Sequence, residues 1–83
     1  MEVLITPEAG RQLEDLPGPI QVRIVRIMAR LEQWPNVSGA RPLRGDLAGR
    51  FRIRTGDYRV QFFPQQNRIV VEKVGHRDGF YEE

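Results

Sequence analysis

The sequence GRFRIRTGDYRV, residues 49–60, alternates arginines with apolar side chains up to a Gly-Asp pair. Arg50, Arg52 and Arg54 fall on one side of this stretch, and the two apolar residues between them fall on the other. A period of two is typical of a β-strand with one buried face and one solvated face. The Gly-Asp pair supplies a tight turn, after which the returning strand carries Arg59. The stretch therefore predicts a β-hairpin with several guanidinium groups on one surface.

Clustered positive charge needs an explanation, because like charges repel and their grouping contributes nothing to packing. One explanation is an anionic ligand that binds the arginine-bearing face. The alternative is a basic strand face that is simply solvated, which is common for an isolated Arg-x-Arg-x-Arg motif.

The chain is short and lacks cysteine. Its 83 residues are enough for one small domain, residues 1–83, close to the size at which a single apolar core only just suffices. Without cysteine, neither a disulfide framework nor a Cys-based zinc site can stabilise it. No apolar run is long enough to span a bilayer, and the first residues resemble a strand rather than a signal peptide. We expect a cytoplasmic protein that does not associate with membranes.

The charge is distributed unevenly along the chain. Residues 41–77 contain nine Lys and Arg residues against three acidic ones, whereas residues 1–40 contain four Arg against five acids. Twelve of the thirteen basic residues are Arg, which binds phosphates in a bidentate manner and stacks on bases. Nucleic acid is therefore the first candidate ligand, and an acidic protein is the second.

Taken in order, the chain predicts an α+β fold with the element order β-α-α-β-β-β. Thr6 suits the N-cap of a first helix and Pro7 its first position, and a Pro-Gly break separates the two helices. Apolar residues at three- and four-residue spacing give the second helix an amphipathic stripe. We expect this helical hairpin to pack on one face of a mainly antiparallel four-stranded sheet, with the arginines on the other face. The expected elements are a strand over 3–5, helices over 7–15 and 19–33, a loop over 35–48, and strands over 50–55, 58–63 and 68–75.

A second group of arginines lies on the second predicted helix. Arg23, Arg26 and Arg30 form a basic ridge apart from the apolar stripe. Such a ridge is more often a solvated helix face than a binding site.

Three short motifs follow one another in the C-terminal half. They are LRGDL with GRFRIR (43–47 and 49–54), GDYRV (56–60), and VGHR (74–77) with Tyr81 four residues further on. In this order and spacing they resemble the RelE/ParE superfamily of type II toxins, and the resemblance covers nearly the whole chain. It implies a microbial RNase-like, RelE-like fold.

The superfamily includes two activities. In the RelE-like branch, the resemblance implies a ribosome-dependent endoribonuclease that cleaves mRNA in the ribosomal A site, inhibits translation and needs neither metal nor other cofactor. In the ParE-like branch, it implies an inhibitor of DNA gyrase without nuclease activity. A third hypothesis is a non-catalytic module whose arginine face binds an acidic antitoxin segment. We favour the endoribonuclease, because the set of residues expected for it is complete.

Metal-free RNA cleavage uses the 2′-OH as the nucleophile on the adjacent phosphorus. The protein has to take the 2′-OH proton, stabilise the extra negative charge and protonate the leaving 5′-oxygen. Arginine suits charge stabilisation but is a poor general base, because guanidinium stays protonated. His76 is the only histidine, the residue type that ordinarily changes charge near neutral pH, and Tyr81 can stack on a base or exchange a proton. The candidate catalytic residues are Arg52, Arg54, Arg59, His76, Arg77 and Tyr81.

Carried over by motif, Arg59 and Arg77 match the phosphate-binding arginines of the family, and Tyr81 matches its C-terminal tyrosine. Arg52 and Arg54 stand where RelE-like enzymes often have lysines, one of which is assigned proton transfer. This departure leaves the general base open between His76 and Tyr81.

The remaining expectations concern binding. Arg41, Arg44, Arg50 and Phe80 are candidate RNA-binding residues, although Phe80 could instead close the core at the end of the chain. A metal site is not expected, since one histidine and three scattered acids in the basic half do not form one. A toxin of this superfamily implies a cognate antitoxin that folds on binding and forms a hetero-oligomer with it, and the RelE-like branch adds mRNA and ribosomal RNA as partners.

Overall fold

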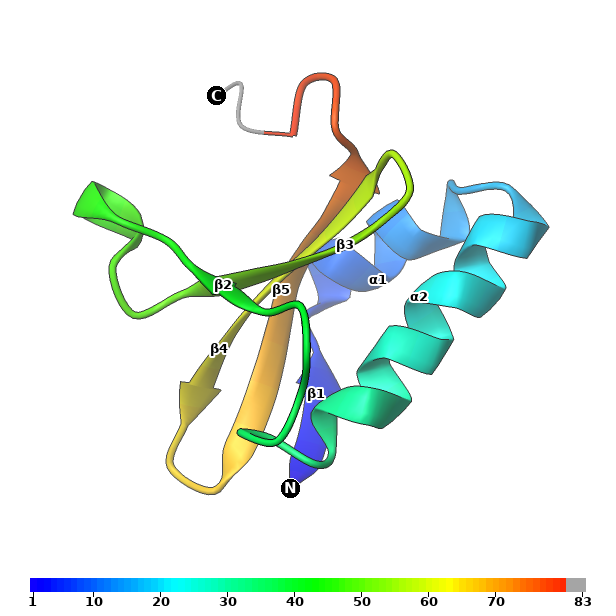
Figure 1. The fold of residues 1–83 in the computed structure, drawn as a ribbon. Coiled ribbons are helices and arrows are strands. Elements are labelled where there is room, and N and C mark those ends of the chain that lie inside the picture. The colour runs from blue at the N-terminus through cyan, green and yellow to red at the C-terminus, as the bar shows by residue number, and fades with distance from the viewer. Residues whose placement is uncertain (81–83) are drawn as a thin grey trace.

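In the computed structural model, which describes residues 1–80, two helices cover one face of a five-stranded sheet (Figure 1). This arrangement confirms the predicted α+β fold with a helical hairpin on one face of the sheet. The elements are β1 (Glu2–Ile5), α1 (Pro7–Glu14), α2 (Gly18–Leu31), β2 (Arg41–Pro42), the 3₁₀ helix η1 (Gly45–Leu47), β3 (Phe51–Thr55), β4 (Tyr58–Gln65) and β5 (Arg68–His76).

Local sequence explains where the two helices begin. The Thr6 hydroxyl accepts a hydrogen bond from the Ala9 backbone N–H at 3.1 Å, which caps α1 as expected. Pro17 holds an extended conformation between the helices. In α2 the apolar stripe turns toward the sheet, so that Ile24, Ile27 and Leu31 are buried.

The strand order in the sheet is β1-β5-β4-β3-β2. β1 runs parallel to β5, and the other neighbouring strands are antiparallel, so the sheet is mainly antiparallel as predicted. A fifth strand lies within the segment expected to be a loop, because Arg41 and Pro42 pair with β3. A two-residue strand is too short to show any alternation in the sequence.

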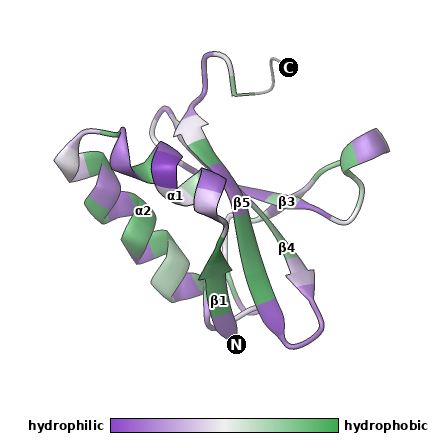
Figure 2. Ribbon diagram, turned by 180° about the vertical axis from the view of Figure 1, so that it is seen from behind, coloured by the Kyte–Doolittle hydropathy of each residue, from purple (hydrophilic) through white to green (hydrophobic). Residues whose placement is uncertain are grey.

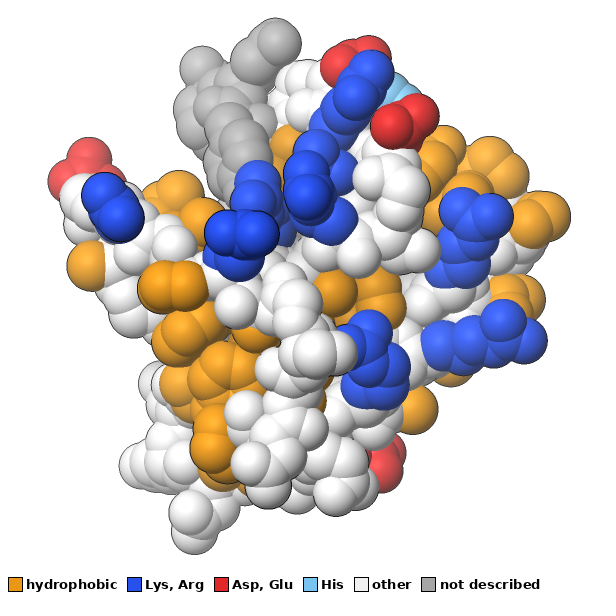
Figure 3. Space-filling model, in the orientation of Figure 1, with side chains coloured by type: hydrophobic (Ala, Val, Ile, Leu, Met, Phe, Trp, Pro, Cys, Tyr) orange, Lys and Arg blue, Asp and Glu red, His pale blue; other side chains and the backbone are white. Residues whose placement is uncertain are grey.

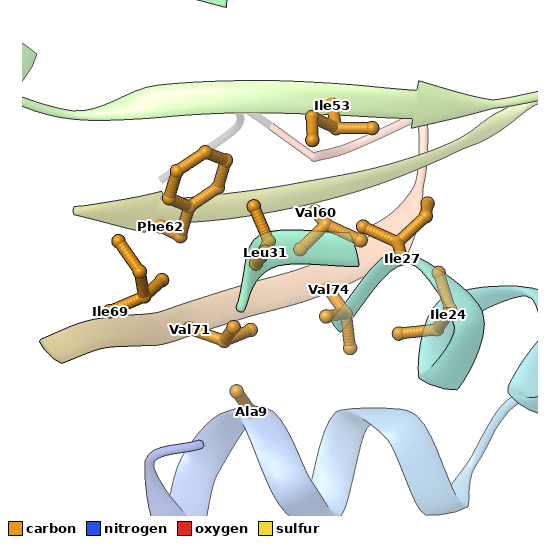
Figure 4. Close-up of a cluster of buried hydrophobic side chains, with 10 residues drawn as sticks. All are labelled: Ala9, Ile24, Ile27, Leu31, Ile53, Val60, Phe62, Ile69, Val71 and Val74. Atoms are coloured by element: carbon orange, nitrogen blue, oxygen red, sulfur yellow. The ribbon is translucent and has the colours of Figure 1, made fainter. Parts of the chain in front are cut away.

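The core lies between the helices and the sheet, where side chains from α1 and α2 point toward those of β3, β4 and β5 (Figure 4). Figure 2 shows hydrophobic residues along β1 and the middle of β5, and as stripes on α2. Phe62 is fully buried, and the Trp34 ring lies edge-on to it at 5.2 Å and to Phe51 at 4.8 Å. No helix within residues 1–80 is long and apolar enough to cross a membrane.

A β-bulge interrupts the pairing of β4 with β5. Phe62 lies opposite Val71 but the preceding Gln61 lies opposite Lys73, so Glu72 has no counterpart in β4. The extra residue changes which face the following side chains occupy. Val71 and Val74 are both buried in the core, and Lys73 lies on the opposite face of the sheet.

Candidate functional site

The sheet face turned away from the helices, here the open face, carries two rows of polar side chains across neighbouring strands. In the first row, Arg41 of β2 pairs with Arg52 of β3, Arg52 with Gln61 of β4, and Gln61 with Lys73 of β5. In the second row, Arg54 pairs with Arg59, and Arg59 with Gly75. The five cations of these rows, Arg41, Arg52, Arg54, Arg59 and Lys73, are called the basic cluster below.

The basic cluster is electrostatically unfavourable without a ligand. Directly opposed residues in antiparallel strands have Cβ atoms about 5 Å apart, and like charges in such pairs destabilise the sheet. Within residues 1–80, the four arginines of the cluster form no ion pair with an acidic side chain. An anion on the open face would relieve this repulsion.

Arg52 also has a hydrogen-bond donor that no described residue satisfies. Its Nε atom is buried, and no hydrogen-bond partner for it is present among the described residues. A buried donor without an acceptor costs about 1–3 kcal/mol, and an oxyanion is the natural acceptor for a guanidinium. Arg59 is only loosely held, with both of its hydrogen bonds to backbone carbonyls at 3.4 Å.

Arg50, predicted to bind RNA, is engaged within the protein. Its Nε donates to Glu72 Oε2 at 2.6 Å, and its guanidinium lies 5.1 Å from the centre of the Phe63 ring. Glu72 Oε2 also accepts from Gln61 Nε2 at 2.9 Å. Glu72 is therefore an acid on the open face that offsets the charge of Arg50.

The described C-terminal segment lies over the second row. The Phe80 ring packs against Gly75, where an added Cβ would lie 3.5 Å from the ring, and Phe80 is only 3% exposed. Lys73 Nζ donates to the Phe80 carbonyl and lies 4.8 Å from the centre of the Phe80 ring. The prediction that Phe80 binds RNA does not fit this position, because its ring has almost no surface left for a base. Phe80 instead closes the packing at this end of the chain, the alternative considered from the sequence.

His76 and Arg77 lie at the end of the sheet. His76 pairs with Tyr58, which packs on the core side, and their rings meet edge-to-face at 5.2 Å. The register therefore places His76 on the face opposite to the basic cluster. Arg77 lies 3.6 Å from carboxylate oxygens of both Asp57 and Asp78, and its backbone N–H donates to the Asp57 carbonyl.

Two further predicted residues lie elsewhere. Arg44 is exposed and precedes η1, which projects away from the sheet (Figure 1). Tyr81 lies outside the described residues. The structure thus brings together Arg41, Arg52, Arg54 and Arg59, and places His76, Arg77 and Arg44 outside their cluster.

Lys73 is the cation of the basic cluster that the sequence did not identify as a site residue. Strict alternation from Ile69 and Val71 would place it in the core, and the bulge at Glu72 reverses its side. It is the only lysine in the chain, and that is the signal that could have drawn attention to it. Within residues 1–80, no group of three His, Asp or Glu side chains is placed to hold a cation.

Comparison with known proteins gives one curated relative and several similar structures. Toxin RelG of Mycobacterium tuberculosis (strain ATCC 25618 / H37Rv) is 34% identical over 82 residues, covering 95% of this chain and 93% of that protein. The toxin–antitoxin complex RelBE2 from Mycobacterium tuberculosis contains a chain of 33% identity and TM-score 0.80, with 92% of this chain and 90% of that one covered. In the RelB–RelE antitoxin–toxin complex from Methanococcus jannaschii, a chain of 23% identity shares the fold at TM-score 0.80 over 95% of each chain. No model of a protein family matches the chain.

Proposed function

The chain belongs to the RelE/ParE superfamily of type II toxins, and from this premise we propose that it is a ribosome-dependent endoribonuclease that cleaves mRNA and so inhibits translation. The observation that carries the proposal is the basic cluster on the open face, where the Nε atom of Arg52 is buried and has no acceptor among residues 1–80. A ligand with several closely spaced negative charges fits such a surface, and RNA is one.

The proposed reaction needs no metal. The 2′-oxygen attacks the adjacent phosphorus, the bond from phosphorus to the 5′-oxygen breaks, and the products are a 2′,3′-cyclic phosphate and a 5′-hydroxyl. Arg52, Arg54 and Arg59 would bind the non-bridging oxygens and stabilise the charge that grows on them in the transition state. Arg77 would assist once the substrate competes with Asp57 and Asp78 for its guanidinium.

Proton transfer requires groups other than arginine. We assign delivery of a proton to the leaving 5′-oxygen to Lys73, because it shares the first row of the open face with Arg52 and its ammonium can release a proton. Removal of the 2′-OH proton falls to Tyr81 or His76. Tyr81 follows Phe80, whose carbonyl Lys73 contacts on the open face, whereas His76 lies on the other side of the sheet. Because Phe80 contacts Lys73 on the open face, we favour Tyr81 over His76 as the group that removes the 2′-OH proton.

The partners follow from the same proposal. The solved relatives named above are complexes of a toxin with its antitoxin, and we propose that this chain also binds a cognate antitoxin and forms a hetero-oligomer with it. Leu4 on β1, and Val22 and Val25 on α2, are large apolar side chains that remain exposed and that an antitoxin would cover. Ribosomal RNA and A-site mRNA would be the nucleic-acid partners, in the cytoplasm.

Primer-extension mapping of a reporter mRNA in a reconstituted translation system tests the function. The wild type would be compared with Arg52→Ala, Arg77→Ala and Tyr81→Phe, and with Arg68→Ala as the control. Arg68 is exposed and lies 3.8 Å from Glu2, away from the basic cluster. Cuts at A-site codons that need ribosomes, persist in the control and disappear in the other variants are expected. Intact mRNA with impaired gyrase supercoiling would refute the endoribonuclease and favour the ParE-like activity.

A further inference from the structure

A groove of about 280 Å³ lies between α2 and the end of β3. It is lined by Arg23, Arg26, Ile27, Arg30, Arg54 and Thr55. The sequence suggested that the three α2 arginines form a solvated ridge. All three are exposed, as expected for such a ridge, and they also lie across a common hollow from Arg54.

The groove carries positive charge that the protein does not balance. Within residues 1–80, Arg23, Arg26 and Arg54 form no ion pair, and α2 contains no acidic residue. Arg30 donates hydrogen bonds to the Ser38 carbonyl at 2.7 Å and to the Ser38 hydroxyl at 3.2 Å. Arginines at i, i+3 and i+7 share one side of a helix, where they repel one another.

The spacing of these charges suits a nucleic-acid backbone. Seven residues of α-helix separate Arg23 from Arg30, a rise of about 10 Å. A stacked strand carries one phosphate per ~3.4 Å of axis, so the ridge spans about three nucleotides. The guanidinium forks can each bind a phosphate in a bidentate manner.

The groove is also continuous with the open face. Arg54 belongs to the second row of the basic cluster, beside Arg59, and it lines the groove as well. Lys and Arg side chains lie over the upper part of the sheet and over α2 on the same side of the molecule (Figure 3). A strand bound at the open face could therefore pass Arg54 and enter the groove.

We propose that this groove, formed by Arg23, Arg26, Arg30 and Arg54, is a second RNA-backbone site that holds the nucleotides flanking the bond to be cleaved. An acidic peptide is a poorer occupant, because Ile27 is the only large apolar side chain among the described residues that line the groove, and it is 4% exposed. A peptide interface depends on apolar anchors, and this groove offers none. The inference rests on the proposed ribonuclease function.

Binding of a non-cleavable RNA tests the groove separately from catalysis. The probe is a fluorescein-labelled 12-nucleotide 2′-O-methyl RNA, which lacks the nucleophile, and fluorescence anisotropy is measured at ~50 and ~200 mM salt. The double variant Arg23→Gln/Arg26→Gln is compared with Arg11→Gln/Arg68→Gln, which removes the same charge from exposed positions elsewhere. We expect Arg23→Gln/Arg26→Gln to weaken RNA binding about 10-fold or more at low salt. It should also make the plot of log K against log salt less steep, by up to about 1.4. The control should change affinity less than about 3-fold.

Equal affinity losses in the two double variants would overturn the proposal. It would also be overturned if the groove variant lost binding of a labelled glutamate-rich 12-residue peptide but kept that of the RNA, since the occupant would then be an acidic protein segment. Failure of the ribonuclease function is a separate result. It would appear as a wild type that leaves ribosome-bound mRNA intact, whatever the anisotropy shows.

Discussion

Replacing Glu72 by Gln should lower stability and raise RNA affinity at the same time. In the structure, Glu72 Oε2 accepts from Arg50 Nε at 2.6 Å and from Gln61 Nε2 at 2.9 Å. The side chains of Arg50 and Glu72 are 36% and 21% exposed, so solvent screens the pair only in part. Glutamine keeps the shape and one acceptor but removes the charge that strengthens both hydrogen bonds. We expect the free energy of unfolding to fall by about 1–2 kcal/mol.

The same change frees Arg50 and leaves the open face one charge more positive. Two unit charges about 10 Å apart in water interact by only ~0.4 kcal/mol, so most of the gain would come from a new contact between Arg50 and a phosphate. Together these effects should strengthen binding of the 2′-O-methyl RNA about 3- to 10-fold at low salt, and less at high salt.

Urea unfolding followed by Trp34 fluorescence measures the first effect, because Trp34 packs against Phe51 and Phe62. Anisotropy measures the second. Glu2→Gln is the matched control, since its partner Arg68 lies 3.8 Å away and both side chains are about half exposed. The control should change stability by less than about 0.5 kcal/mol. If Glu72→Gln weakens RNA binding while the protein remains folded, the open face is not the RNA site.

Three other predictions concern catalysis and stability. Lys73→Arg keeps the positive charge, but a guanidinium cannot deliver a proton, so the cleavage rate should fall about 100-fold or more. RNA affinity should stay within about 3-fold of the wild type. A Lys73→Arg variant that still cleaves would exclude Lys73 as the general acid. Phe62→Ala removes the largest fully buried side chain and should cost about 3–5 kcal/mol in urea unfolding, a value that a loosely packed core would not reach. Gly10→Ala lies in α1, where an added Cβ meets nothing within 4 Å, and it should stabilise the protein by about 0.5–1 kcal/mol. Gly56→Ala lies at φ +59°, where a side chain is strained, and it should destabilise the protein. If both substitutions changed the free energy of unfolding in the same direction, this reasoning would be refuted.

The sequence predicted the parts of the fold that depend on local periodicity. The hairpin over 49–60 and the amphipathic stripe of the second helix are clear patterns, and both form at the expected places. The same alternation correctly placed Arg52 and Arg54 opposite the core. Strand order could not be predicted, because pairing β1 with β5 joins residues far apart in the chain.

The candidate site was predicted less completely, and one bulge accounts for much of the difference. Counting by twos from Ile69 places Lys73 in the core and His76 on the open face. The register observed after Glu72 reverses both positions. The buried Phe80 ring packs against Gly75, a contact that no local pattern reveals.

The bulge also means that β5 consists of two segments whose faces are assigned independently. Before Glu72 the odd-numbered side chains of β5 point into the core, and after Glu72 the even-numbered side chains point into it. If β5 paired regularly with β4 and kept all of its residues, Lys73 would turn toward the helices and Val74 toward solvent, although neither side chain had been altered. Comparisons of β5 between relatives therefore have to be aligned on the bulge, since the number of residues between the turn and Lys73 matters as much as their identity.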